Sequence, residues 1–443
     1  MRVIVFFLLL DSVLGQGIVS TPAGTLSYDE DWGYVQVRND AHTFWWLFTV
    51  KSDPYRPLIL WLHGGPGKDS TGIGNLGILG PKDVNFRNRN STWLQVADLV
   101  FVDSPVGAGF SYVNNDSALT TNVKQIGSDL VAWSKAFFTK HPEYQTRDFY
   151  IAGVSYGGKV AVEFARQLQD AIDTGEIKAK LAGVNLGNSW ISSMDFVNTW
   201  GLYLHAMSYI DSSQLRIMDK KASECQGFVD NQNWYDAMTC WREMAILVEK
   251  LTKNINWTNI LKSQKVNPRS KEGISGENKS PGKNSIKIQF ERGFGQQNNQ
   301  IVDLMNRQMR EKFKIIPSNV GFGTRSGAII GKHWGDFMTP NYDTVDNLLK
   351  RGILVTIMNG QLDLICTTLG VELWLKRLTW SGNNKFLNSE KEIYTTSDNS
   401  EIYGFYKKYQ NLQMFYVLKA GHVIPRDAPW AALEALKIIL KKN

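Results

Sequence analysis

The sequence Gly-Val-Ser-Tyr-Gly at residues 153–157 places a serine between two glycines. An apolar run that begins at residue 149 leads into this motif, and a helical pattern starts after it, near Lys159. A serine on a tight turn between a strand and a helix needs glycine two residues before and two residues after it, because a Cβ at either place would collide with the neighbouring strand or helix. Ser155 is therefore the predicted nucleophile of a serine hydrolase.

A histidine and a carboxylate are needed to activate this serine. The histidine accepts the proton of the hydroxyl, and the carboxylate fixes the tautomer of the histidine and stabilises its charged form. Asp363 follows an apolar run at 353–357, and His422 follows another at 415–418. Serine, acid and histidine occur in this order along the chain of α/β-hydrolases. We therefore predict a catalytic triad of Ser155, Asp363 and His422.

The same chemistry needs N–H groups that bind the oxyanion of the tetrahedral intermediate. The residue after the nucleophile, Tyr156, supplies one such backbone N–H. The segment Trp-Leu-His-Gly-Gly-Pro-Gly at 61–67 follows an early apolar run and contains glycines that let backbone amides approach a substrate carbonyl. We predict that the second donor is the N–H of Gly65.

Apolar runs with the length and β-branched content of strands buried on both faces recur along the chain. They lie at 58–62, 99–102, 149–152, 181–184, 353–357 and 415–418. Two earlier aromatic-rich runs, at 34–37 and 44–50, predict an antiparallel pair of strands. Helical patterns lie between several of the runs, at 123–138, 159–172 and 342–349. This alternation predicts an α/β-hydrolase fold with a mostly parallel central sheet.

The strand pattern lapses between residues 191 and 332, where helical stretches dominate at 212–222, 234–250 and 301–312. We predict that this segment is a helical cap, inserted between two parts of an α/β-hydrolase core at 16–190 and 333–443. Within it, residues 266–300 are rich in Asn, Gly, Ser and Lys. That composition buries little apolar surface and predicts a polar loop.

The N-terminus has the features of a signal peptide at residues 1–15. Arg2 is followed by an apolar stretch at 3–10 and by small residues that end at Gly15. A secreted or lysosomal location follows from this prediction. Four Asn-x-Ser/Thr sequences are predicted glycosylation sites on this route. They begin at Asn90, Asn115, Asn256 and Asn278.

Three cysteines allow at most one internal disulfide. Cys225 and Cys240 are the local pair, and we predict that they are bonded. The remaining thiol, Cys366, lies three residues after the predicted catalytic acid. We expect it to be a small buried core residue.

Charge and motif content exclude several other classes of function. The formal net charge of +7 comes from Lys and Arg residues scattered along the chain, which argues against nucleic-acid binding. No later apolar segment is long enough to suggest membrane insertion. The G-x-G-x-x-G match at 72–77 lacks the acidic residue of a dinucleotide site, and the histidines form no metal-ligand motif. We expect no cofactor and no metal.

Six motifs, in order over nearly the whole mature chain, resemble those of the serine carboxypeptidase family. They are W-L-H-G-G-P-G at 61–67, D-S-P-V-G-A-G-F-S-Y at 103–112, G-V-S-Y-G-G at 153–158, L-G-N-S-W at 186–190, N-G-Q-L-D at 359–363 and A-G-H at 420–422. The resemblance implies an α/β-hydrolase fold with a cap, in a secreted or lysosomal enzyme. It also implies release of the C-terminal residue from peptide substrates that have a free C-terminus.

Two glutamates of that family are replaced in this chain. Family members carry one Glu directly before the nucleophile and another two residues before a Gly-Pro that follows the oxyanion loop. These carboxyls share a proton and help to bind the C-terminal carboxylate of the substrate. Val154 and Ile78 stand at the two positions, His63 replaces an amide side chain, and Lys68 replaces a small residue. We assign His63, Gly64 and Val154 to the substrate-binding surface.

These replacements leave three functions open. The first is carboxypeptidase activity in which His63 or Lys68 binds the substrate carboxylate in place of the lost glutamates. The second is an esterase or acyl-transfer activity toward less charged substrates, because His-Gly-Gly also resembles the oxyanion loops of esterases. The third is a weakly active or non-enzymatic secreted homologue that kept the fold.

Overall fold

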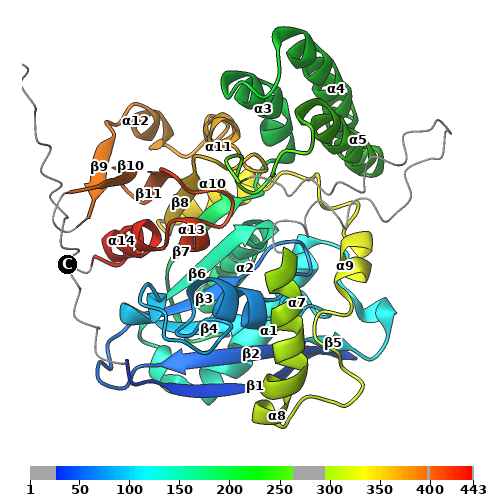
Figure 1. Ribbon diagram of the computed structural model, residues 1–443. Helices are drawn as coiled ribbons and strands as arrows, with labels where there is room; N and C mark the ends of the chain where they lie inside the picture. The colour runs from blue at the N-terminus through cyan, green and yellow to red at the C-terminus, as the bar shows by residue number, and fades with distance from the viewer. Residues whose placement is uncertain (1–25, 263–294, 397–399, 442–443) are drawn as a thin grey trace, which may run out of the picture.

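The computed structural model describes residues 26–262, 295–396 and 400–441 of the chain (Figure 1). The predicted signal peptide at 1–15 lies outside these residues, as does most of the predicted polar loop at 266–300. The last residues of that loop prediction are in the described part and were wrongly assigned, because helix α7 already begins at Gly295.

An eleven-stranded mixed sheet forms the centre of the molecule, in the order β1-β2-β4-β3-β6-β7-β8-β11-β10-β9, with β5 paired to β2. The strands are β1 (Asp29–Arg38), β2 (Ala41–Thr49), β3 (Leu58–Leu62), β4 (Asp98–Val102), β5 (Tyr112–Val113), β6 (Asp148–Ser155), β7 (Lys180–Ser189), β8 (Leu354–Gly360), β9 (Glu392–Thr395), β10 (Ile402–Tyr409) and β11 (Leu412–Val417). Neighbouring strands from β4 to β11 are parallel, and the strands at both edges are antiparallel.

The six parallel strands are the six apolar runs of the sequence, and β1 and β2 form the predicted antiparallel pair. The mostly parallel sheet is therefore confirmed. The sequence analysis missed β9 and β10. These two strands are the last two on one side of the sheet, and nine of their twelve residues are exposed or partly exposed, so no continuous apolar run marks them.

Helices cover both faces of the sheet (Figure 1). On one face pack α1 (Val123–Lys140), α2 (Tyr156–Asp173) and α10 (Tyr342–Lys350). On the other pack the π-helical segment η1 (Ser70–Leu79), α13 (Ile424–Asp427) and α14 (Pro429–Leu440). Trp45 and Trp46 show the alternation along a strand, since each is 2% exposed and they pack into the cores on opposite faces.

The predicted insertion at 191–332 contains two groups of helices in different places (Figure 1). The first group, α3 (Ser193–Ala206), α4 (Ser212–Asp230) and α5 (Trp234–Thr252), lies at one end of the molecule beyond the sheet. The second group consists of α7 (Gly295–Leu304), η6 (Met305–Met309) and α8 (Arg310–Phe313).

This second group packs against the core sheet. The ring of Phe313 contacts the rings of Phe44 and Trp46 of β2, at centroid distances of 5.2 Å and 4.8 Å. Ile301 and Met305 lie in the same hydrophobic core. The division of the chain at residues 191 and 332 stays a prediction.

Shorter helices complete the described fold. They are η2 (Trp93–Gln95), η3 (Asp116–Ala118), η4 (Pro142–Tyr144), α9 (Ser326–Lys332), α11 (Thr368–Leu375) and α12 (Asn383–Leu387). A disulfide between Cys225 and Cys240 joins α4 to α5, as predicted, and the free thiol of Cys366 is buried. Among the helices of the described residues, none has the length and apolar character needed to cross a bilayer.

Candidate active site

Ser155 is the last residue of β6 and is followed at once by α2. Its backbone has φ 58° and ψ −130°, a conformation that an L-residue rarely adopts and that nucleophile elbows use. A Cβ at Gly153 would lie 2.3 Å from the carbonyl oxygen of Gly157, and one at Gly157 would lie 2.4 Å from that of Leu62. The turn is therefore possible only with glycine at these two positions.

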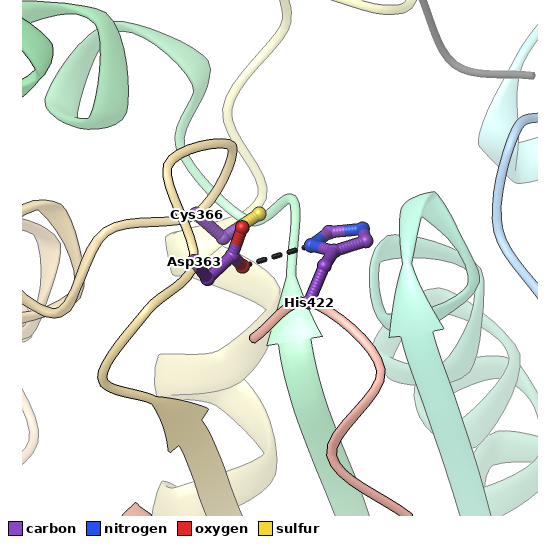
Figure 2. A group of neighbouring side chains, drawn as sticks. All are labelled: Asp363, Cys366 and His422. Carbon is purple, nitrogen blue, oxygen red and sulfur yellow. Dashed lines mark hydrogen bonds and ion pairs between the residues drawn. The ribbon is translucent and has the colours of Figure 1, made fainter. Parts of the chain in front are cut away.

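Asp363 and His422 lie in the loops that follow β8 and β11, and they point toward each other (Figure 2). The Nδ1 atom of His422 is 2.8 Å from Oδ2 of Asp363. The other carboxylate oxygen accepts the backbone N–H of Ile365 at 2.8 Å, and the Asp363 side chain is fully buried. The carboxylate is thus held in place, and it leaves Nε2 of His422 as the nitrogen that can exchange a proton with a serine.

Ser155 and His422 line one pocket together with most of the other predicted site residues. The pocket is lined by His63, Gly64, Gly65, Lys68, Val154, Ser155, Thr258, Ile365, His422 and Val423. Gly64 lies so close to the nucleophile that a Cβ there would be 2.6 Å from the Cβ of Ser155. Gly65 has φ +122°, which favours glycine. The structure therefore brings the predicted oxyanion loop next to the elbow.

Two residues that the sequence analysis did not single out hold the loops of the triad together. The side chain of Asn188, at the end of β7, accepts the N–H of Gly360 and donates to the carbonyl of Gly421, both at 2.7 Å. The N–H of His422 donates to the carbonyl of Thr258 at 2.6 Å. The signal for Asn188 was a polar residue within the L-G-N-S-W motif, near the end of a buried strand.

Cys366 lies close to the acid and the histidine (Figure 2). One ligand atom from each of Asp363, Cys366 and His422 falls within 4.8 Å of the others. Burial, followed by the charge of Asp363, raises the pKa of the Cys366 thiol well above its usual value. A protonated thiol beside an acid and a histidine that already bind each other is a poor metal site.

The imidazole of His63 is neutral in the folded protein. Burial, and to a smaller extent the nearby Lys68, His422 and Arg426, together lower its pKa to about 3. His63 is only 6% exposed, and its backbone N–H donates to Oγ of Ser70 at 3.1 Å. His63 therefore contributes no positive charge to the pocket at working pH.

Two buried carboxylates hold the segment that follows the oxyanion loop. Asp69 accepts the N–H groups of Gly72 and Ile73, and Asp103 accepts those of Ser70 and Thr71, over distances of 2.6 to 3.0 Å. Burial, followed by the charge of Asp69, raises the pKa of Asp103 to about 7. This pair escaped the sequence analysis because nothing in the spacing of residues 69 and 103 indicates that they meet.

Comparisons with known proteins agree with this geometry. The family model described as serine carboxypeptidase, Peptidase S10, matches residues 22–442. The chain belongs to the serine carboxypeptidase family. It is 40% identical to the retinoid-inducible serine carboxypeptidase of Mus musculus, over 94% of this chain and 92% of the mouse protein. It is 35% identical to serine carboxypeptidase-like 51 of Arabidopsis thaliana, over 93% and 92% of the two chains.

Comparison with a solved structure confirms the fold. The prohormone-processing carboxypeptidase Kex1Δp of Saccharomyces cerevisiae superposes with a TM-score of 0.80, at 19% identity, over 95% of this chain and 92% of the yeast chain. The predicted α/β-hydrolase fold is thereby confirmed.

The two positions at which family members carry glutamate are apolar and buried here. Val154 and Ile78 are each 2% exposed and belong to the same hydrophobic core. A second small cavity lies beside Val154 and is lined mainly by apolar side chains, among them Trp61, Trp93 and Met358. A single carboxyl group buried there would lack a partner, so the replacement of both glutamates by aliphatic residues keeps this region compatible with folding.

The described glycosylation positions differ in exposure. Asn90 and Asn115 are exposed. Asn256 is half-buried, and its side-chain oxygen accepts the backbone N–H groups of Thr258 and Asn259 at 3.0 and 3.1 Å. Asn278 lies outside the described residues. Glycosylation of all four stays a prediction, and Asn90 and Asn115 are the two that an oligosaccharide could reach without local rearrangement.

The buried neutral state of His63 predicts a pH-dependent contribution to stability. Its pKa in the folded chain lies below the ordinary value of 6.5, so the unfolded chain binds more protons between about pH 3 and pH 6.5, and stability is lost as the pH falls through that window. Between pH 7 and pH 5 this loss is about 2 kcal/mol. His63→Gln should escape it, and urea unfolding of both proteins at the two pH values measures the difference.

Comparing the variant with wild type cancels the opposite contribution of Asp103, whose raised pKa makes it favour folding at lower pH. Equal losses of unfolding free energy in the two proteins would contradict a buried, neutral His63.

Proposed function

We propose that this protein is a serine carboxypeptidase that releases C-terminal residues from peptides through an acyl-enzyme on Ser155. The observation that carries the proposal is the buried Asp363–His422 hydrogen bond of 2.8 Å beside a serine on an elbow, in a chain of this family. Oγ of Ser155 attacks the last peptide carbonyl while Nε2 of His422 takes its proton. His422 then protonates the leaving amino acid, and a water molecule hydrolyses the ester by the reverse proton transfers.

The oxyanion that forms in both steps is stabilised by the backbone N–H groups of Gly65 and Tyr156. Support comes from the contact of Gly64 with Ser155, from the place of Gly65 in the pocket wall, and from the position of Tyr156 at the start of α2. The N-terminus of a helix adds partial positive charge at this point. No cofactor or metal takes part in this scheme.

Lys68 binds the C-terminal carboxylate of the substrate in place of the lost glutamates. Its side chain is half-buried and lines the same pocket as Ser155. Val154 supplies no polar atom from its side chain, and the neutral His63 supplies no charge. An ammonium group pairs with a carboxylate through charge-assisted hydrogen bonds, and it needs no added proton to do so. His63, Gly64 and Val154 form the surrounding surface against which the last residue packs.

This mode of recognition changes the pH range in which the enzyme works. A pair of carboxyl groups binds a carboxylate only while it retains a proton, whereas an ammonium group such as that of Lys68 needs no shared proton to bind one. We therefore propose a working range closer to neutrality than a carboxyl pair would permit.

A secretory route fits the chemistry of the chain, with either a secreted or a lysosomal end point. The predicted signal peptide at 1–15, the Cys225–Cys240 disulfide and the exposed sequons at Asn90 and Asn115 support it. Expression of the full chain in a secreting cell, followed by glycosidase treatment and detection in medium and lysosomes, tests this location.

Mass spectrometry of unlabelled peptides tests the proposed activity. Incubation with a peptide of mixed sequence should give products that are shortened by one residue at a time from the C-terminus. A peptide amide and an aryl ester run in parallel separate the alternatives. Hydrolysis of the ester with no shortening of the free peptide would instead favour an esterase, and inertness toward all three would favour a non-enzymatic homologue.

A further inference from the structure

A buried ionic cluster lies directly under the nucleophile elbow and is not part of the scheme above. It consists of Tyr156 and Lys159 in the first turn of α2 and Asp336 in the loop between α9 and α10. Tyr156 is 1% exposed, Lys159 is fully buried, and Asp336 is 8% exposed. Lys159 and Asp336 are absent from the lining of the substrate pocket, so the cluster does not meet the substrate directly.

The contacts within the cluster are short and converge on one carboxylate oxygen. The hydroxyl of Tyr156 donates to Oδ2 of Asp336 at 2.6 Å, and Nζ of Lys159 lies 3.1 Å from the same oxygen. Nζ of Lys159 also donates to the carbonyl of Asp336 at 2.5 Å and to two oxygens of Thr339 at 2.8 Å each.

The charges explain why these three residues must stay together. Lysine in the first turn of a helix lies at the positive end of the helix dipole, and a buried ammonium there needs a carboxylate partner. Asp336 supplies it. Burial alone would raise the pKa of Asp336, but the charge of Lys159 and the hydrogen bonds from Tyr156 and Lys159 together outweigh burial and lower it. Burial, and then Asp336, raise the pKa of Tyr156 well above its usual value, so the phenol remains the donor.

The loop that carries Asp336 is itself fixed. The indole N–H of Trp190 donates to the carbonyl of Phe337 at 3.0 Å, and the hydroxyl of Ser193 donates to that of Met338 at 2.7 Å. Trp190 directly follows β7, and Ser193 begins α3. The side chain of Tyr156 is thus anchored to a segment braced by the sheet and by the first of the α3–α5 helices.

We propose that Asp336 is a positioning residue for catalysis, which fixes the backbone N–H of Tyr156 toward the oxyanion by holding the Tyr156 hydroxyl and Lys159. This positioning role of Asp336 rests on the proposed function, in which the backbone N–H of Tyr156 is an oxyanion donor. Preorganised donors stabilise the transition state only when they are held where the negative charge develops. Because Tyr156 directly follows Ser155, holding its side chain restricts the movement of its backbone N–H.

The least disruptive test is Tyr156→Phe, which removes the hydroxyl and keeps the ring. Asp336→Asn is the second variant. For Tyr156→Phe we expect kcat to fall about tenfold, with KM nearly unchanged, because the interaction matters in the transition state. The rate constant for labelling by a fluorophosphonate should fall by a similar factor. So should the affinity for a peptide boronate that forms a tetrahedral adduct, whereas the affinity for the product amino acid should not change.

Tyr144→Phe is the matched control. Tyr144 is also 1% exposed, and its hydroxyl donates to the fully buried Asp98 at 2.8 Å, at the start of β4 and hence at the opposite end of the parallel strands from the triad. Its loss should lower stability and leave kcat and labelling unchanged.

The outcomes separate this inference from the proposed function. A wild-type protein that does not react with the fluorophosphonate would refute the function of Ser155, and the positioning role with it. A reactive wild type whose labelling rate, kcat and boronate affinity match those of Tyr156→Phe would overturn the positioning role alone. The same holds if Tyr144→Phe loses as much activity as Tyr156→Phe, because the effect would then be one of general stability.

Discussion

Replacing Ser155 with alanine should lower kcat for peptide hydrolysis by about 10⁴-fold or more. The substitution removes the only atom that forms the acyl-enzyme in the proposed scheme, while the oxyanion donors and the pocket remain. Asp363→Asn should cost about 10⁴-fold through a different cause, because an amide no longer holds His422 in the tautomer that accepts the serine proton. Steady-state rates on a blocked dipeptide with a free C-terminus measure both effects.

Folding must be separated from chemistry in this test. Ser155→Ala removes one oxygen from a side chain that is 9% exposed, so its thermal unfolding should stay close to that of wild type. Ser128→Ala, at an exposed position of α1, is a control that should keep full activity. Fluorophosphonate labelling that persists in Ser155→Ala would place the nucleophile elsewhere and overturn the assignment of the site.

Lys68→Met should abolish most of the preference for substrates with a free C-terminal carboxylate. We expect kcat/KM on the free acid to fall by about 10- to 100-fold, the usual cost of losing a charge-assisted hydrogen bond. The rate on the matching C-terminal amide should change little, because that substrate carries no charge for the lysine to bind. The ratio of the two rates is therefore the informative quantity, more than either rate alone.

Two control variants show whether a change in the ratio of the acid and amide rates comes from the loss of the Lys68 charge. Lys68→Arg keeps the positive charge and should retain much of the preference for the free acid. Lys124→Met removes an exposed lysine from α1, away from the pocket lining, and should leave the ratio as it is in wild type. A Lys68→Met protein that loses activity equally on acid and amide would show that Lys68 supports the oxyanion loop and does not recognise the carboxylate.

The centre of the fold could be predicted from the sequence because each parallel strand is buried on both faces. A strand such as β3 (Leu58–Leu62) must then be apolar at every position, and it appears as a continuous run. Strand β10 (Ile402–Tyr409), next to the edge strand β9, has only two buried residues, Gly404 and Lys407, so it gave no such run. The hydrophobic pattern of a sequence shows which residues are buried, and strands at the edge of a sheet are too exposed to give a clear pattern.

The place of the α7–α8 segment could not be predicted for a related reason. Its helical character was recognised at residues 301–312, but an amphipathic pattern shows only that one side of a helix is buried. That Phe313 packs against Trp46, across more than 260 residues of sequence, depends on the tertiary fold.

The proposed triad residues could be chosen from the sequence because they follow apolar runs that are marked by motifs, and these runs form β6, β8 and β11 of the parallel part of the sheet. The charge state of the pocket could not be predicted from the sequence. Arg426 acts on His63 only because α13 packs beside η1, the helical segment that follows the oxyanion loop. Asp336 and Tyr156 likewise meet only in the folded chain. Sequence motifs indicated the candidate reacting groups, whereas the surroundings that set their charge and position required the structure.

Selection of peptide ends without the family's glutamates is the central claim, and one comparison on the wild-type enzyme tests it most directly. The measurement is kcat/KM for a blocked dipeptide with a free C-terminus and for its C-terminal amide, at neutral pH and low salt. We predict that the free acid is cleaved at least about tenfold faster, as one charge-assisted hydrogen bond from Lys68 would give. Equal rates, or a preference for the amide, would contradict the account.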